Sequence, residues 1–172
     1  DKVEVDRFGY YKIVDRIKAI ICLSSGKNVA PAKIESLFAT SPYIDQVFTI
    51  GDERAVISML FVPNLTYFKD KFDREGIGYD KNAVVIDSSA GAPIVVKVGP
   101  DFIEKGNIRG LIAEEIAKAN RELEGFEQIK QHTVLCERFT EQNGMLTPTQ
   151  KVKKRVVLDV YSGEIEKMYS RP

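Results

Sequence analysis

The strongest constraint on the fold is that β-prone segments arrive in pairs joined by short turns. Residues 44–50 and 55–62 are rich in β-branched and aromatic side chains, and residues 51–54 form a hairpin-like connection between them. Pro63 ends the second segment, because proline has no N–H to donate to a neighbouring strand. An earlier pair of such segments lies within residues 10–23. This pairing favours antiparallel strands over the strict alternation of strands and helices that builds a parallel sheet.

Helical periodicity appears between and after these strand pairs. Asn64 can cap a helix to about residue 74, and Asn107 can cap the clearest helix in the chain. One face of that second helix carries Ile108, Leu111, Ile112, Ile116, Ala119 and Leu123. A last helix is expected to start near Lys151 and to be interrupted near Gly163. The sequence therefore predicts an α+β fold, with a small mainly antiparallel sheet flanked by helices and preceded by a β-hairpin.

Composition and charge fit a folded domain and exclude several classes of function. At 172 residues with 44% hydrophobic side chains, the chain can bury a core without disulfides or metals. Its 25 basic and 25 acidic residues balance, whereas proteins that coat nucleic acid or anionic lipid carry a basic excess. Cys22 and Cys136 have no CxxC spacing, which disfavours a zinc site or a disulfide framework and favours a reducing cytosol.

The chain ends and its apolar stretches give two further expectations. No apolar stretch approaches the roughly 18 residues that a membrane span needs. The first residues, Asp1 to Asp6, do not resemble a signal peptide, and the chain has no initiator Met. We therefore expect a piece of a longer protein without a transmembrane segment.

Two segments could meet an anion. Ser25-Gly26-Lys27-Asn28 lacks the earlier glycine and the following Ser or Thr of a P-loop, so by itself it indicates a surface turn. Residues 151–155, Lys-Val-Lys-Lys-Arg, form the densest basic run, which by itself is typical of a solvated helix start. Cations are unfavourable at a helix N-terminus, and a nearby anion would explain the run better. His132 stands alone, and no Ser-His-Asp set, metal cluster or close carboxylate pair is evident, so we expect no complete active site.

Several motifs, in their order, resemble a known family. Asp15-Arg16-Ile17-Lys18, the run SGKNVAP over residues 25–31 and then Ile34-Glu35 resemble the start of the C-terminal domain of adenylate-forming enzymes. FEQIK at residues 126–130 and NGMLTPTQKVK at residues 143–153 resemble the long-chain fatty acid–CoA ligase branch. The resemblance covers about residues 1–72 and 107–169. It implies a hairpin and hinge over residues 1–18 and a C-terminal lid domain over residues 19–172, with an insertion at 76–106.

The resemblance implies a role for each matching residue. Lys151 takes the place of the catalytic lysine, whose ammonium offsets charge as the fatty acid carboxylate attacks the α-phosphate of ATP. Arg16 and Asp1 match the pair that hydrogen-bonds the ribose hydroxyls. Lys18 matches the hinge, whose backbone torsions absorb a rotation of the domain. The loop matching the one that lines the CoA tunnel consists of Ser25, Gly26, Lys27 and Asn28.

The reaction and the partners are implied in the same way. An N-terminal adenylation domain outside this sequence would hold ATP, Mg²⁺ and the fatty acid, and the C-terminal domain would rotate over it between two poses. In the first pose acyl-adenylate and pyrophosphate form, and in the second the CoA thiol displaces AMP to give acyl-CoA. We therefore expect part of an AMP-forming acid–thiol ligase, inactive as an isolated fragment, with no metal ligands of its own and no nucleic acid partner. A cytoplasmic location fits, and peripheral association at the inner membrane face stays open.

Three departures from the family pattern leave the acyl substrate open. Ala19 stands where many relatives have an acidic residue, Ser25 replaces the first glycine of a Gly-Gly pair, and Gln150 stands where many adenylating enzymes have glycine. Two other functions stay open beside the ligase. One is an adenylating enzyme that loads a carrier protein instead of CoA. The other is a non-catalytic module that binds an anionic partner through the basic run.

Overall fold

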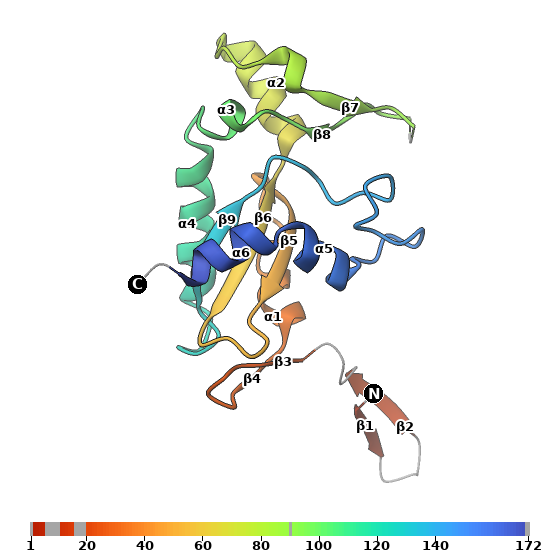
Figure 1. The fold of residues 1–172 in the computed structure, drawn as a ribbon, viewed down its shortest axis with the longest axis vertical. Coiled ribbons are helices and arrows are strands. Elements are labelled where there is room, and N and C mark those ends of the chain that lie inside the picture. Colours follow the sequence, from red (N-terminus) through yellow and green to blue (C-terminus); the bar gives the residue numbers. More distant parts are fainter. Residues whose placement is uncertain (1, 6–10, 16–19, 90, 171–172) are drawn as a thin grey trace.

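A three-stranded sheet lies at the centre of the computed structural model, which describes residues 2–5, 11–15, 20–89 and 91–170. The sheet consists of β5 (Ile44–Ile50), β6 (Ile57–Pro63) and β9 (Ile129–Val134), with β6 in the middle (Figure 1). β5 and β6 run antiparallel, whereas β6 and β9 run parallel. Every residue of β6 is buried, so both faces of the sheet are covered.

The alternation of side chains along β6 divides the interior into two cores. Ile57, Met59 and Phe61 point into the first core, and Leu60 and Val62 point into the second. The helices that supply the first core include α1 (Pro31–Ser36), α2 (Leu65–Glu75) and α4 (Ile108–Asn120). The second core is covered by α5 (Lys154–Val160) and α6 (Ser162–Tyr169), which cross the other face of the sheet in Figure 1.

Three two-stranded hairpins accompany the central sheet. They pair β1 (Lys2–Val5) with β2 (Tyr11–Asp15), β3 (Ile21–Cys22) with β4 (Asn28–Val29), and β7 (Val85–Asp87) with β8 (Ile94–Lys97). All three are antiparallel, which confirms the predicted α+β fold with a mainly antiparallel sheet and a leading hairpin. The prediction differs in one pairing. The strand at residues 11–15 pairs with β1, and Ile21–Cys22 folds back on the strand that follows it.

Residues 76–106, the expected insertion, contribute to the first core. They form a short 3₁₀ helix, η2 (Lys81–Ala83), the β7–β8 hairpin, and α3 (Pro100–Ile103). Val95 and Phe102 are buried, and the rings of Phe102 and Phe72 lie 4.8 Å apart between centroids. At Gly106 φ is +55°, and a Cβ there would lie 2.2 Å from the Phe72 ring. Only glycine fits this approach between the segment and α2.

The helix starts agree with the sequence in one case and differ in two. The side chain of Asn64 caps α2 by accepting a hydrogen bond from the Tyr67 N–H at 3.1 Å, as predicted. Asn107 precedes α4 but has φ of 57° and makes no side-chain cap. The last helix begins at Lys154 instead of Lys151, and it breaks at Tyr161 instead of Gly163. Among the described helices, none is long and apolar enough to cross a membrane.

Candidate functional site

Lys151 lies near the tip of a short hairpin formed by residues 145–153, called the lysine hairpin below. Leu146 and Val152 pair across it as an antiparallel bridge, and the Lys153 N–H donates to the Met145 carbonyl at 2.8 Å. This pairing replaces the helical start predicted for Lys151. The first arm is anchored because Met145 and Leu146 are buried in the second core.

The turn at the tip fixes the backbone of Lys151 and leaves its side chain free to solvent. The Gln150 N–H donates to the Thr147 carbonyl at 2.8 Å, and Gln150 has φ of 61°, as in three-residue hairpin loops that end in a left-handed residue. The Thr147 N–H donates to the Lys151 carbonyl at 2.8 Å, and the Thr147 hydroxyl accepts from the Lys151 N–H at 3.1 Å. The Lys151 side chain is exposed, and its ammonium pairs with none of the described residues.

The other cations of the basic run are equally exposed. Lys153, Lys154 and Arg155 surround the start of α5, and no ion pair joins them to any residue in the described part of the chain. The run therefore places several cations together on the surface. This arrangement can attract an anion, and it has no acidic partner within the described ranges that would neutralise it.

The predicted CoA-tunnel loop has the same backbone pattern on a second hairpin. Between β3 and β4 the Gly26 N–H donates to the Leu23 carbonyl at 2.8 Å, and the Leu23 N–H donates to the Lys27 carbonyl at 2.9 Å. Gly26 has φ of +79°, so it holds the place that Gln150 holds in the lysine hairpin. In both hairpins a lysine directly follows the left-handed residue. Ser25, Gly26, Lys27 and Asn28 are all exposed.

Contacts with neighbouring segments brace this loop at its base. The Ser24 N–H donates to the Arg54 carbonyl at 2.9 Å, and the Lys27 ammonium lies 5.5 Å from the centre of the Phe126 ring. Close by, Lys33 of α1 pairs at 2.5 Å with Glu127, whose side chain is 9% exposed. The loop tip therefore stands on a fixed base, with a cation held over an aromatic face.

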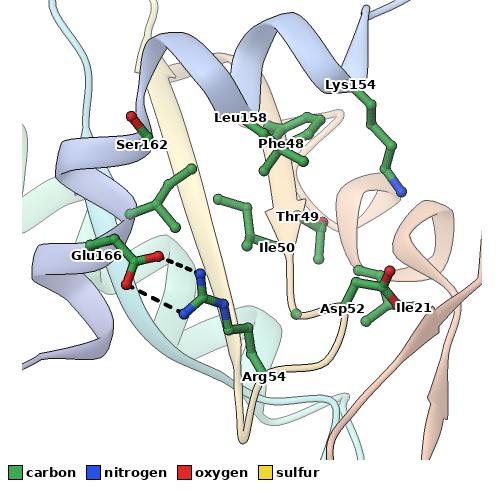
Figure 2. Close-up of a pocket in the computed structure, with 12 residues that line it drawn as sticks. Ile21, Phe48, Thr49, Ile50, Asp52, Arg54, Lys154, Leu158, Ser162 and Glu166 are labelled. Carbon is green, nitrogen blue, oxygen red and sulfur yellow. Dashed lines mark hydrogen bonds and ion pairs between the residues drawn. The ribbon is translucent and has the colours of Figure 1, made fainter.

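A cleft of about 320 Å³ opens between α5, α6 and the β5–β6 turn. Figure 2 shows Lys154 extending from α5 toward the side where Asp52 lies, and Arg54 facing Glu166 across the lower part of the cleft. The hydrogen bond from Arg54 lowers the pKa of the Glu166 carboxyl. Apolar side chains, among them Phe48 and Ile50, line the floor. No predicted site residue lines this cleft.

The structure places the predicted site residues in separate regions. Lys151 and the 25–28 loop lie on two hairpins at different edges of the molecule, one before α5 and one between β3 and β4 (Figure 1). Asp1, Arg16 and Lys18 lie outside the described residues. Within the described ranges, no group of three or more His, Cys, Asp or Glu side chains could hold a metal ion.

One polar residue near the lysine hairpin was not recognised from the sequence. The side chain of Asn143 makes four hydrogen bonds within residues 137–145. The Asn143-Gly144 dipeptide signals a turn, which Gly144 confirms with φ of 77°. The dipeptide does not reveal that the side chain bonds both earlier and later residues.

Comparison with known proteins gives a family for most of the chain. A family model described as the AMP-binding enzyme C-terminal domain matches residues 18–85 and 76–172. The long-chain fatty-acid–CoA ligase FadD15 of Mycobacterium tuberculosis is 32% identical over 167 residues, which are 97% of this chain and 25% of that protein. Human long-chain fatty-acid–CoA ligase 6 is 28% identical over 165 residues, 94% of this chain and 21% of that protein. The chain thus spans about a quarter of the length of these curated relatives.

Solved structures show the same fold at lower identity. The adenylation domain of a carboxylate reductase from Mycobacterium chelonae has a TM-score of 0.64 and 20% identity, covering 96% of this chain and 24% of that one. The A domain of a carboxylic acid reductase from Segniliparus rugosus has a TM-score of 0.62 and 22% identity, covering 94% of this chain and 21% of that one.

Proposed function

Because this chain belongs to the family of AMP-binding enzyme C-terminal domains, we propose that it is the mobile lid of a long-chain fatty acid–CoA ligase. The whole enzyme would join fatty acid and CoA at the expense of ATP, releasing AMP and pyrophosphate through an acyl-adenylate. The observation that carries the proposal is the lysine hairpin, whose backbone is fixed while the Lys151 ammonium faces solvent without a partner among the described residues. Such a side chain is arranged to act on something outside its own fold.

Lys151 would serve the first half-reaction. An exposed ammonium in water stabilises a nearby anion only weakly, whereas in a preformed pocket that excludes water the same charge acts strongly. We therefore propose that the lid delivers Lys151 to the reacting carboxylate and α-phosphate in a pocket of the N-terminal domain. Asp1 and Arg16 would hydrogen-bond the ribose at the junction between the two domains.

The 25–28 loop would serve the second half-reaction. In that pose the lid turns about Lys18, so that the β3–β4 hairpin replaces the lysine hairpin at the acyl carbon and lines the path of the CoA thiol. Two hairpins at different edges of a rigid domain suit this exchange, because one rotation withdraws the first and presents the second. Because Gly26 has no side chain and its backbone is exposed, a narrow ligand chain can approach the loop closely.

ATP and its Mg²⁺ would be held mainly by the N-terminal domain. The part of the chain that the structure describes contains no cluster of carboxylate, imidazole or thiolate groups that could ligate a metal. Mg²⁺ bound to the ATP phosphates would neutralise charge during adenylation. The lid would contribute the positive charge of Lys151 to the reacting groups.

Separate measurement of the two half-reactions in the full-length enzyme tests this function. Lys151→Ala should slow fatty acid-dependent pyrophosphate release by about a hundredfold, since one charge aimed at the transition state is lost. It should leave CoA attack on preformed acyl-adenylate nearly unchanged. Lys167→Ala, which removes an exposed charge from α6, is the matched control and should alter neither step. Equal loss of both steps in Lys151→Ala would refute the proposed role.

The acceptor is tested in the same enzyme. We propose CoA, in keeping with the names of the curated relatives. Assays with CoA and with a holo-carrier protein, each added to preformed acyl-adenylate, compare the two acceptors directly. A higher specificity constant for the carrier protein would replace CoA in the proposal.

Binding of the chain to acidic lipid or RNA that weakens with salt, together with an inactive full-length protein, would favour the anion-binding module.

A further inference from the structure

The β7–β8 hairpin lies against the chain that leads to the lysine hairpin. Besides β7, β8 also pairs with the chain around Glu137. The Arg138 N–H donates to the Val96 carbonyl at 2.8 Å, and Lys97 and Glu137 form an antiparallel bridge. The side chains of Lys97 and Glu137 form an ion pair at 3.0 Å. Residues 76–106, which have no counterpart in the sequence motifs, therefore contact the beginning of the 137–145 loop.

Asn143 joins that contact to the lysine hairpin with both ends of its side-chain amide. Its Nδ2 donates to Glu137 Oε1 at 3.2 Å and to the Arg138 carbonyl at 2.8 Å. Its Oδ1 accepts from the Thr140 N–H at 3.0 Å and from the Met145 N–H at 3.3 Å. One half-buried side chain thus ties the start of the loop to its end.

Met145 connects the 137–145 loop to the hairpin that carries Lys151. Its N–H is shared between Asn143 Oδ1 at 3.3 Å and the Thr140 carbonyl at 3.1 Å, and the Thr140 N–H is itself bonded to Asn143 Oδ1. Its carbonyl accepts from the Lys153 N–H at 2.8 Å, at the open end of the lysine hairpin. A displacement of Met145 would therefore displace both arms of the hairpin and the tip that carries Lys151. The lysine stem is flexible, so the backbone position sets the volume that the ammonium can reach.

We propose that Asn143 is a positioning residue for Lys151, and that the β7–β8 hairpin supports it through Lys97 and Glu137. The inference rests on the proposed function and extends it to residues that touch no substrate. A second contact also joins the β7–β8 hairpin to the 137–145 loop, since the Gln142 side chain donates to Asp87 of β7 at 3.2 Å. A catalytic group misplaced by about 1 Å can lose a hundredfold in rate, so such bracing has a measurable consequence.

The two half-reactions of the full-length enzyme give the test. Asn143→Ala should slow fatty acid-dependent pyrophosphate release by about tenfold or more, with KM for ATP unchanged and CoA attack on preformed acyl-adenylate within about twofold of wild type. Asn120→Ala is the matched control. Asn120 also clasps backbone, accepting from the Ile129 N–H at 2.8 Å and donating to the Ile129 carbonyl at 3.0 Å, but it lies between α4 and β9. Its loss should change both half-reactions to the same extent.

The contribution of the β7–β8 hairpin is tested at Glu137. Glu137→Leu removes one of the two acceptors of Asn143 Nδ2 and also the partner of Lys97, whereas Lys97→Met removes only the partly exposed ion pair. We expect a selective loss of adenylation in Glu137→Leu and a smaller one in Lys97→Met. An equal decrease of both half-reactions in these variants would remove the hairpin from the proposal.

Each remaining outcome decides the role of Asn143. If Asn143→Ala lowers both half-reactions equally, as the control does, the residue is structural and the inference is overturned. If that variant does not fold, Thr140→Val removes only the hydroxyl that accepts from the Asn143 N–H at 3.1 Å, and the same split is required of it. Lys151→Ala, measured alongside, separates the failures. Intact adenylation in that variant refutes the proposed function itself, whereas selective loss there with an unselective Asn143→Ala refutes the positioning role alone.

Discussion

At Gln150 the backbone adopts φ of 61°, which closes the turn of the lysine hairpin in the left-handed region. An L-residue there is strained by roughly 1–2 kcal/mol, and glycine removes this strain. Glycine also increases the conformational entropy of the unfolded chain, which lowers the stability by about 0.4–1 kcal/mol. We expect Gln150→Gly to raise the free energy of unfolding by about 0.5 kcal/mol. Urea denaturation measures this change in the free energy of unfolding. Thr149→Gly, one residue earlier and without a positive φ, should lower the free energy of unfolding. If both glycine variants change that free energy in the same direction, the left-handed turn does not have this role.

Tyr161 gives a prediction for alkaline pH. Burial raises the pKa of its phenol from 10.0 to about 12, so the native state keeps the proton over a range where the unfolded state loses it. The contribution of Tyr161 to stability is therefore complete below pH 10 and is lost as pH rises toward 12. We expect the unfolding free energy to fall over that range by about 1 kcal/mol more in wild type than in Tyr161→Phe, because solvent screens the half-buried phenol. Parallel pH profiles of the two proteins would show that Tyr161 is not responsible.

Among the elements, those with a local signal were predicted well. β5 and α2 follow from an unbroken β-prone run and from a capping Asn64 ahead of apolar residues at helical spacing. The lysine hairpin was missed because its pairing of Leu146 with Val152 depends on burial in the second core. A basic run resembles a helix start in composition, and nothing local shows that α5 begins three residues later.

One hydroxyl adds a hydrogen-bonded link between α6 and the sheet. Tyr169 accepts a hydrogen bond from the fully buried Ser58 hydroxyl at 2.8 Å and donates to the Val56 carbonyl at 3.0 Å. Tyr169→Phe should lower the free energy of unfolding by about 1–3 kcal/mol, because it leaves a buried donor without a partner. Thermal or urea unfolding measures the loss.

A double-mutant cycle controls that experiment. In Ser58→Ala/Tyr169→Phe both partners are absent, so the loss should be smaller than the sum of the two single losses. Strictly additive losses would show that the hydrogen bond does not couple α6 to β6.

For the whole molecule, the fold class could be predicted from the sequence, but the spatial arrangement of the candidate residues could not. The motifs singled out Lys151 and the 25–28 loop as candidates, and only the folded chain shows that they lie on two separate hairpins. The link from β8 through Glu137 to Asn143 joins residues 46 positions apart, from Lys97 to Asn143, and no local pattern encodes such a contact. Long-range polar contacts of this kind are set by packing of the complete chain.

The proposed rotation of the whole lid yields a prediction at Lys18. Proline fixes φ near −65°, so Lys18→Pro should restrict a hinge at this position. We expect thioester formation to fall more than adenylation in the full-length enzyme, measured as the ratio of the two single-turnover rates. Lys18→Ala keeps the torsional freedom and should leave the ratio unchanged. A proline variant with the wild-type ratio would place the hinge elsewhere.

The most direct test of one lid serving two reactions compares its two hairpins in a single experiment. Lys151→Ala and Gly26→Val are introduced separately into the full-length enzyme, and single-turnover rates are measured for both half-reactions. A Cβ at Gly26 would meet no atom of the chain within 4 Å, so valine acts there through the positive φ and through its bulk on the side proposed for the ligand. We predict that Lys151→Ala slows adenylation only, and that Gly26→Val slows attack by CoA only. If both variants slow the same half-reaction, or slow both equally, the two hairpins do not divide the work between them.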